Sequence, residues 1–199
     1  MYVFCSDLEG VWVPEVWINV ARITGIDDLK LTTRDISDYD VLMKRRISIL
    51  KQHNLTLRDI QRVISNIEPL EGAKETLWWL RNVAQIYILS DTFVEFADPL
   101  MAKLDRPPLF CNNLVVNGDG MIVDYTLRQC DQKREVVKAF KSMNYQVVAF
   151  GDSYNDISML KEADAGILFR PPQKVIDEFP QFPVVNNYEE LLRELKKYI

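Results

Sequence analysis

Histidine and cysteine are scarce in this chain of 199 residues, and their scarcity limits the chemistry it can carry. There is one histidine, His53, and the cysteines Cys5, Cys111 and Cys130 are odd in number and widely spaced. A zinc cluster does not fit this pattern, and we expect reduced thiols in a cytoplasmic protein. We interpret Cys5 as a small core residue and His53 as a surface residue at the end of a helix.

Long apolar runs and an excess of positive charge are also missing. No stretch is apolar over the length that spans a bilayer, and no basic region precedes the first apolar run, so we expect neither a membrane segment nor a signal peptide. The net charge of −5 argues against nucleic acid as a partner. Because 48% of the residues are hydrophobic and 27% are charged, we expect a globular protein with a substantial core.

Short apolar runs alternate with helical periodicity along most of the chain. We predict strands at the N-terminus and over residues 85–89, 109–111, 146–150, 165–169 and 182–185, and a β-hairpin with its turn at residues 117–120. Helices are predicted over residues 14–21, 41–52, 57–67, 72–82, 93–104, 132–143, 157–163 and 188–198. This order indicates an α/β protein with a Rossmann-like, doubly wound parallel sheet and an accessory hairpin.

Residues 15–68 have no strand signal and are predicted to form a small helical cap domain inserted after the first strand. The core would then consist of residues 1–14 and 69–199. Thr56 is the predicted N-cap of the helix over 57–67. The insertion leaves the sheet at the edge where open α/β sheets bind their ligands, so we expect it to act as a lid. The pair Trp78 and Trp79 is interpreted as packing of a helix on the sheet.

Acidic residues follow two of the predicted strands. Asp7 and Glu9 end the first apolar run, and Asp152 and Asp156 follow the run over 146–150. In an open α/β sheet such strand ends meet at the ligand-binding edge. Asp7 and Asp152 could hold one divalent cation between them, and Asp7 could also attack phosphorus. The spacing therefore predicts a magnesium-dependent phosphoryl-transfer enzyme.

Two further features follow in chain order, and together the four resemble a known family. Ser90 comes after the next core strand, and Lys133 lies at the start of a predicted helix. An acidic loop, a Ser or Thr, a Lys and a Gly-Asp-x-x-x-Asp loop are the motifs of the haloacid dehalogenase superfamily of phosphotransferases, which the chain resembles over its whole length.

The detailed resemblance is to the phosphoserine phosphatase branch, and within it to bacterial enzymes that also transfer the phosphoryl group to homoserine. The stretches that carry this likeness are DLEGVWVPEVWI, TTRDISDYDVLMKRRISIL, PLEGA, ILSDTFVEF, LRQCDQKR, GDSYNDISML and AGILF–EFPQFP. The resemblance implies hydrolysis of O-phosphoserine, with water or homoserine as the acceptor, in amino-acid biosynthesis. It is compatible with a homodimer.

The resemblance implies that Asp7 is the nucleophile that forms an aspartyl-phosphate and that Glu9 is the general acid/base. The implied ligands of Mg²⁺ are Asp7, the backbone carbonyl of Glu9 and Asp152, with Asp156 orienting the bound waters. The wider superfamily usually has aspartate where this chain has Glu9. Because glutamate is one methylene longer, we hypothesise that it favours an acceptor alcohol larger than water.

The phosphoryl group itself is implied to contact residues from three motifs. Ser90 and the backbone N–H of Asp91 would bind one of its oxygens at a helix N-terminus. Lys133 would neutralise both the phosphoryl group and the Asp7 carboxylate. Asn155 would donate a hydrogen bond nearby.

Arg46 lies in the middle of an otherwise apolar helix face. The apolar residues of that face are Leu42, Met43, Ile47, Ile49 and Leu50. A buried arginine needs a partner, and a substrate carboxylate matches its two-pronged donor geometry. The resemblance also assigns this contact to Arg46 and gives the substrate ammonium group to Glu15. The alternative is an internal salt bridge from Arg46 to Asp38 or Asp40.

Two other functions remain open from the sequence. The same chemistry could act on another small phosphomonoester, or the fold could serve as a non-catalytic interaction module.

Overall fold

The computed structural model describes residues 1–32, 35–36 and 38–199. Thr33, Arg34 and Ser37, which belong to one of the stretches quoted above, lie outside the described residues.

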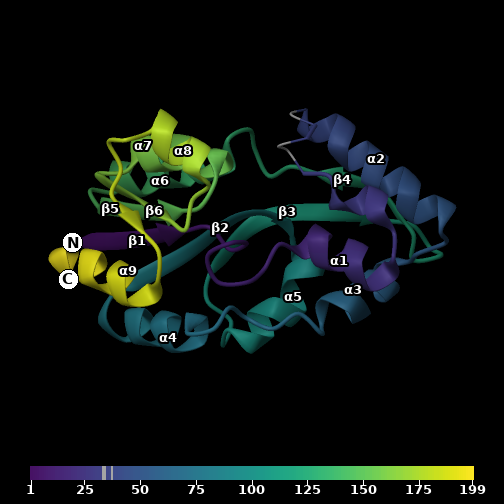
Figure 1. The fold of residues 1–199 in the computed structure, drawn as a ribbon, viewed down its shortest axis with the longest axis horizontal. Helices are drawn as coiled ribbons and strands as arrows, with labels where there is room; N and C mark the ends of the chain where they lie inside the picture. The colour runs from purple at the N-terminus through teal and green to yellow at the C-terminus, as the bar shows by residue number, and fades with distance from the viewer. Residues whose placement is uncertain (33–34, 37) are drawn as a thin grey trace.

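Seven strands form a single sheet in the order β4-β3-β2-β1-β5-β6-β7 (Figure 1). The strands are β1 Tyr2–Ser6, β2 Gln85–Phe93, β3 Leu109–Val116, β4 Ile122–Thr126, β5 Gln146–Gly151, β6 Ala165–Phe169 and β7 Val184–Val185. Neighbouring strands pair in parallel except β3 and β4, which form an antiparallel hairpin. The predicted fold class, a parallel α/β sheet with an accessory hairpin, is confirmed.

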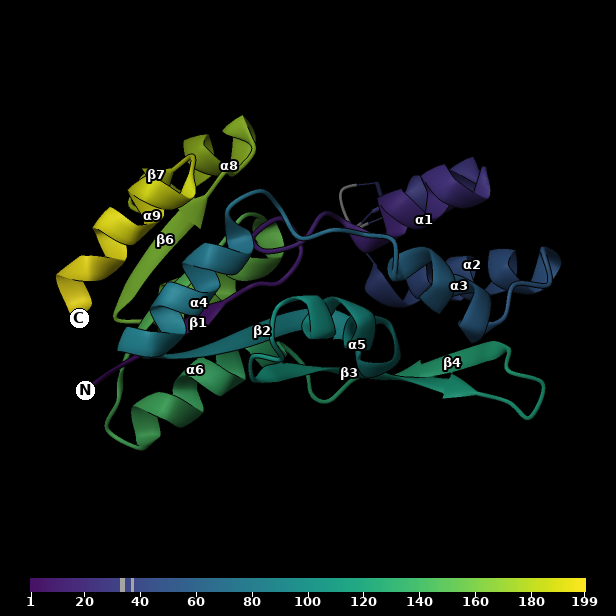
Figure 2. The ribbon, with the colours of Figure 1, turned by 90° about the horizontal axis from the view of Figure 1, so that it is seen from below.

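The central strand β1 is buried on both faces, as its nearly uninterrupted apolar sequence predicts. Phe4 packs in one apolar cluster, which includes residues of the helices α4 Ala73–Val83, α5 Val94–Lys103 and α9 Tyr188–Leu195. Val3 and Cys5 point the other way, into a cluster with residues of the helices α6 Gln132–Ser142, α7 Ile157–Glu162 and α8 Gln173–Glu178. Figure 2 shows α4 and α6 on opposite sides of the sheet. Cys5 is fully buried, so its interpretation as a core residue is confirmed.

The helices follow the predicted pattern with shifts of a few residues. They are α1 Val16–Thr24, α2 Tyr39–Gln52, α3 Leu57–Ile64, α4 Ala73–Val83, α5 Val94–Lys103, α6 Gln132–Ser142, α7 Ile157–Glu162, α8 Gln173–Glu178 and α9 Tyr188–Leu195, with 3₁₀ turns at Asp27–Lys30, Tyr154–Asp156 and Lys196–Tyr198. The short helix α8 was not expected from the sequence. None of the described helices is long and apolar enough to cross a membrane.

Three sequence-based expectations need correction. The separate strands expected over 109–111 and in the first arm of the hairpin are one continuous strand, β3. Strand β2 continues past Leu89 to Phe93. Trp78 does not pack on the sheet, because its side chain lies on the outer face of α4 and is 63% exposed. Trp79 is partly buried beneath the Lys196 ammonium, 5.2 Å from the ring centre.

Helices α1, α2 and α3 are inserted between β1 and α4, and they pack beside the β3–β4 hairpin and α5 (Figures 1 and 2). The Leu57 N–H donates to the Gly120 carbonyl in the hairpin turn at 2.9 Å. The Tyr125 hydroxyl of β4 donates to Asp40 at 2.8 Å. The hairpin therefore supports the inserted helices from one side.

Thr56 caps α3 as predicted, through a reciprocal pair of hydrogen bonds with Asp59. We expect Thr56→Ala to lower the free energy of unfolding by about 1 kcal/mol, because the Asp59 N–H loses its side-chain acceptor and the Asp59 carboxylate loses the Thr56 hydroxyl as a donor. Thr56→Ser keeps the hydroxyl and is the matched control. Denaturant titrations measure both, and equal losses in the two variants would contradict a capping role.

Candidate active site

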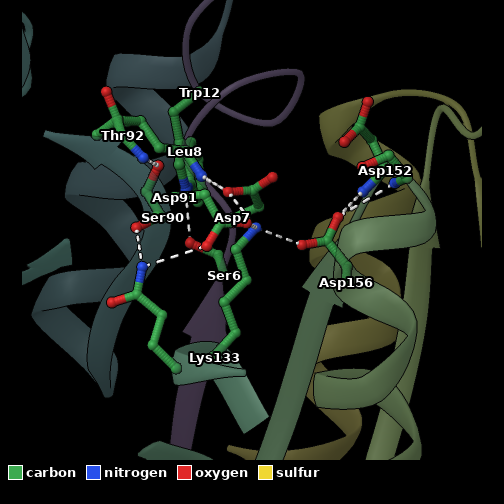
Figure 3. A network of polar contacts seen from close by, with 12 residues as sticks. Ser6, Asp7, Leu8, Trp12, Ser90, Asp91, Thr92, Lys133, Asp152 and Asp156 are labelled. Atoms are coloured by element: carbon green, nitrogen blue, oxygen red, sulfur yellow. Dashed lines mark hydrogen bonds and ion pairs between the residues drawn. The ribbon is translucent and has the colours of Figure 1, made fainter. Parts of the chain in front are cut away.

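Asp7 lies at the carboxyl end of β1, at the base of a cavity (Figure 3). Its backbone N–H donates to the Phe150 carbonyl of β5 at 3.1 Å, which holds it beside the end of that strand. The Leu8 N–H donates to Oδ1 of Asp7 at 2.7 Å. The Trp12 indole N–H donates to Ser6 Oγ at 2.7 Å and ties the following loop back to the strand.

A buried ammonium group joins the two acidic strand ends. Lys133 Nζ lies 2.9 Å from Oδ1 of Asp7 and 2.8 Å from Oδ1 of Asp156 (Figure 3). Burial disfavours the charge on Lys133, but Asp156 and Asp7 outweigh it and hold the pKa of the ammonium well above its usual range. Burial and the nearby Asp156 raise the pKa of Asp7, against the opposing effect of Lys133.

Asp156 is fully buried and organises the loop after β5. Its Oδ2 accepts hydrogen bonds from the N–H groups of Asp152 and Ser153, at 3.0 and 3.1 Å. Two glycines make room for this arrangement. A Cβ at Gly151 would lie 2.3 Å from Asp156 Cγ, and one at Gly10, where φ is +76°, would lie 2.4 Å from an Asp152 oxygen.

Asp7, Asp152 and Asp156 form a group that could hold a metal ion, since one carboxylate oxygen of each lies within 4.8 Å of the others. Every donor in this set is a hard oxygen, which suits Mg²⁺, Ca²⁺ or Mn²⁺ rather than a thiolate-seeking metal. The residues present therefore fit a hard divalent cation.

Glu9 lies two residues beyond Asp7 and is held by the start of the insertion. Its Oε2 accepts a hydrogen bond from the Val16 N–H at 2.7 Å. Burial, together with the neighbouring Glu15 carboxylate, raises the pKa of Glu9 to about 8. Glu9 therefore retains its proton at neutral pH in this state. Glu15 directly precedes α1 and also lines the cavity.

Arg46 of α2 is buried on the side of the same cavity that the inserted helices form. Its guanidinium lies 4.5 Å from the centre of the Trp17 ring, and Nη2 donates to the Leu31 carbonyl at 2.8 Å. Burial lowers the pKa of Arg46 to about 10, so it stays charged at neutral pH. Its Nε is buried and has no hydrogen-bond partner among the described residues.

The alternative partners considered for Arg46 are engaged elsewhere. Asp38 accepts a hydrogen bond from the Val41 N–H at the start of α2. Asp40 pairs with Lys44 and accepts the Tyr125 hydroxyl. Within the described part of the chain, neither carboxylate forms a salt bridge with Arg46.

Ser90 and Asp91 lie within β2 and not at a helix N-terminus, because the strand continues to Phe93 and α5 begins only at Val94. The pairing of β2 with β3 changes register between Leu89 and Phe93, which turns this segment toward the cavity side. Ser90 Oγ accepts a hydrogen bond from the Thr92 N–H at 3.2 Å.

Two residues that the sequence analysis did not single out hold the Ser90–Asp91 segment. The Gln132 side chain donates from Nε2 to the Ser90 carbonyl at 2.8 Å and to Asp91 Oδ1 at 3.2 Å. The Tyr39 hydroxyl donates to the Asp91 carbonyl at 3.2 Å. The adjacency of Gln132 to Lys133 is the one signal that could have pointed to it.

The cavity has a volume of about 860 Å³ and brings together residues that are far apart in the sequence. The predicted site residues on its wall are Asp7, Glu9, Glu15, Arg46, Ser90, Asp91, Lys133, Asp152 and Asn155. Asp156 lies behind this wall and contacts Lys133 from there. The insertion and the sheet therefore share one site.

Gly151 gives a direct test of how Asp156 is placed. We expect Gly151→Ala to displace Asp156 and to reduce the affinity of this site for a divalent cation at least about 10-fold, because residues that orient metal ligands typically matter on that scale. Calorimetric titration of Mg²⁺ measures the effect. Gly118→Ala, in a loop where a Cβ meets no atom within 4 Å, is the control. Unchanged affinity in Gly151→Ala would contradict this role of Asp156.

Comparison with known proteins agrees with the fold described above and shows which proteins the chain resembles. Residues 15–164 match a family described as haloacid dehalogenase-like hydrolase. The chain is 58% identical to phosphoserine phosphatase ThrH of Pseudomonas aeruginosa, over 99% of this chain and 96% of that protein.

Several solved structures match nearly the whole chain. A phosphoserine phosphatase in apo form superimposes with a TM-score of 0.77 at 26% identity, covering 99% of this chain and 98% of the other. A phospho-aspartyl intermediate analogue of phosphoserine phosphatase gives a TM-score of 0.76 at 25% identity, with the same coverage. The likeness therefore includes both the sheet and the inserted helices.

Proposed function

The chain belongs to the haloacid dehalogenase-like hydrolases, and from this premise we propose that it is a phosphoserine phosphatase acting through an aspartyl-phosphate on Asp7. The observation that carries the proposal is the buried cluster of Asp7, Lys133 and Asp156 beneath a cavity whose far wall holds Arg46. A nucleophilic carboxylate and a carboxylate-binding arginine in one cavity match the two ends of phosphoserine.

We propose Mg²⁺ as the cation, with Asp7, the backbone carbonyl of Glu9 and Asp152 as its protein ligands. Asp156 supports the site from behind, because its two oxygens already accept hydrogen bonds from Lys133 and from the N–H groups of the Asp152 loop. When bound, the ion would neutralise charge on the phosphoryl oxygens and align them for attack.

Asp7 attacks phosphorus in this mechanism. The Leu8 N–H and the Lys133 ammonium both hold Oδ1, so we assign the attack to Oδ2. Lys133 offsets the negative charge that would otherwise keep a carboxylate away from a phosphate ester. Ser90 Oγ, the Asp91 N–H and the Asn155 side chain bind the phosphoryl oxygens.

Glu9 moves the proton in both half-reactions. It enters with its proton, consistent with its raised pKa, and donates it to the serine oxygen as the phosphorus–oxygen bond breaks. The resulting carboxylate then takes a proton from the acceptor hydroxyl, which attacks the phosphorus of the aspartyl-phosphate. Asp7 leaves as a free carboxylate, and Glu9 has its proton again.

The substrate's amino-acid end binds on the cap side. Arg46 presents a buried Nε without a hydrogen-bond partner among the described residues and a guanidinium fixed over Trp17, which suits a fixed carboxylate. Glu15 binds the ammonium group. In this proposal residues 15–68 form the cap and residues 1–14 and 69–199 form the core, and the cap closes over the substrate.

We further propose that homoserine competes with water as the acceptor. Homoserine carries the same carboxylate and ammonium groups as serine, so it fits the same cap contacts, with its hydroxyl one methylene farther out. Glu9 has the longer side chain suited to reach that hydroxyl.

The first test is a Mg²⁺-dependent assay with O-phosphoserine, with and without homoserine, that follows free phosphate and O-phosphohomoserine together. We expect turnover that EDTA abolishes and Mg²⁺ restores, and phosphohomoserine that increases as free phosphate decreases. If only free phosphate forms, the proposed transfer to homoserine is wrong. If there is no turnover, phosphoserine is not the substrate, and other small phosphomonoesters should be assayed.

The length of Glu9 can be tested in the same assay. We expect Glu9→Asp to lower the ratio of phosphohomoserine to free phosphate, because the shorter carboxylate suits water better than the larger alcohol. The ratio for the unsubstituted enzyme under identical conditions is the reference. An unchanged ratio would contradict a role of Glu9 in selecting the acceptor.

Arg46 gives a test of the substrate itself. We expect Arg46→Ala to lower kcat/KM for phosphoserine about 10- to 100-fold, the range for loss of a charged hydrogen-bond partner. Phosphoethanolamine, which lacks the carboxylate, should be affected far less. Arg45→Ala is the control, since Arg45 is exposed and pairs with Asp28. Equal losses on both substrates would contradict carboxylate recognition by Arg46.

A further inference from the structure

The side chain of Gln132 connects the phosphoryl-binding segment of β2 to the first turn of α6. We propose that Gln132 is a positioning residue, which orients and polarises the Ser90–Asp91 peptide group so that its N–H binds the phosphoryl group. This inference rests on the proposed function, because that function assigns the Asp91 N–H to a phosphoryl oxygen.

The contact that carries the inference is the 2.8 Å hydrogen bond from Gln132 Nε2 to the Ser90 carbonyl. The Ser90 carbonyl and the Asp91 N–H are the two ends of the same planar peptide group. Fixing the carbonyl therefore fixes the direction of the N–H. A hydrogen bond accepted by the carbonyl also polarises the peptide and makes its N–H a stronger donor.

Further contacts hold the peptide from both sides. Gln132 Nε2 lies 3.2 Å from Oδ1 of Asp91 as well, so one amide group grips both residues of the segment. The next carbonyl, that of Asp91, accepts the Tyr39 hydroxyl and the Asn112 side-chain amide, each at 3.2 Å. These side chains act where the change of register interrupts regular pairing between β2 and β3.

The position of Gln132 in the chain links two phosphoryl-binding groups. Gln132 and Lys133 are the first two residues of α6. Lys133 contacts Asp7 on one side, and Gln132 contacts the Ser90–Asp91 peptide on the other. The start of one helix thus sets the distance between the ammonium and the peptide N–H that would face the same phosphoryl group.

The remaining atom of the Gln132 amide argues against a purely structural role. Gln132 is only 5% exposed, and the Oε1 atom of its side chain has no hydrogen-bond partner among the described residues. An unsatisfied buried acceptor lowers stability, so an apolar side chain of similar size would suit folding better. Glutamine at this position is therefore explained by the hydrogen bonds that its amide donates to the Ser90–Asp91 segment.

The test separates activity from stability. In Gln132→Met, which keeps the length and removes the donor, we expect kcat/KM for phosphoserine to fall about 10-fold or more, mainly in kcat, while Tm stays unchanged or rises. Gln181→Met, at an exposed position, controls for the chemical change. Wild-type kinetics in a folded Gln132→Met enzyme would overturn the inference, as would a loss of activity that only parallels a loss of Tm.

A second readout does not depend on turnover. We expect the Asp91 backbone amide proton to move downfield in NMR spectra when Mg²⁺ and beryllium fluoride, a phosphoryl analogue, are added to the wild-type protein. The shift should shrink in Gln132→Met, or in Gln132→Glu if the methionine variant does not fold. Equal shifts in variant and wild type would overturn the inference. If the Asp91 amide proton shifts as expected but the protein does not hydrolyse phosphoserine, the proposed substrate is wrong and the inference about Gln132 stands.

Discussion

The buried ammonium of Lys133, held between the carboxylates of Asp7 and Asp156, is the constraint on which the rest of the site depends. Two carboxylates, one directly after β1 and one in the loop that follows β5, would repel each other in a buried setting, and the ammonium between them would cost far more to bury alone. The sheet order puts these strands side by side, and α6 delivers the cation. The glycines at positions 10 and 151 then leave space for the acidic side chains that complete the cluster.

This arrangement explains why a carboxylate can meet a phosphate ester. Positive charge is fixed at the base of the cavity by Lys133 and on the side of the inserted helices by Arg46, and the raised pKa of Glu9 favours its protonated form. The substrate suited to this pattern is negative at both ends, with a leaving oxygen that needs a proton in the middle. The inserted helices matter because they supply one of the two charges and the contact that keeps Glu9 in place.

The acidic residues at the strand ends were the part of the site that the sequence predicted most directly. Asp7 and Asp152 could be brought together because apolar runs of parallel strands end at one edge, and Arg46 stood out because its helix face is otherwise apolar. The contacts of Gln132 could not be predicted from the sequence. They join segments about 40 residues apart, and the acceptor is a backbone carbonyl, which every residue has and which leaves no signal in the sequence. The course of β2 through Ser90 and the exposure of Trp78 depend on a register shift and on tertiary packing, which local periodicity does not report.

The central claim is that Asp7 carries the phosphoryl group between donor and acceptor. The most direct measurement is to stop the reaction of the enzyme with O-phosphoserine and Mg²⁺ in acid, reduce the acyl-phosphate with borohydride, and locate the modified residue by peptide mass spectrometry. The account predicts modification at Asp7, dependent on substrate and absent from Asp7→Asn. Modification at another residue, or turnover with Asp7 unmodified, would contradict it.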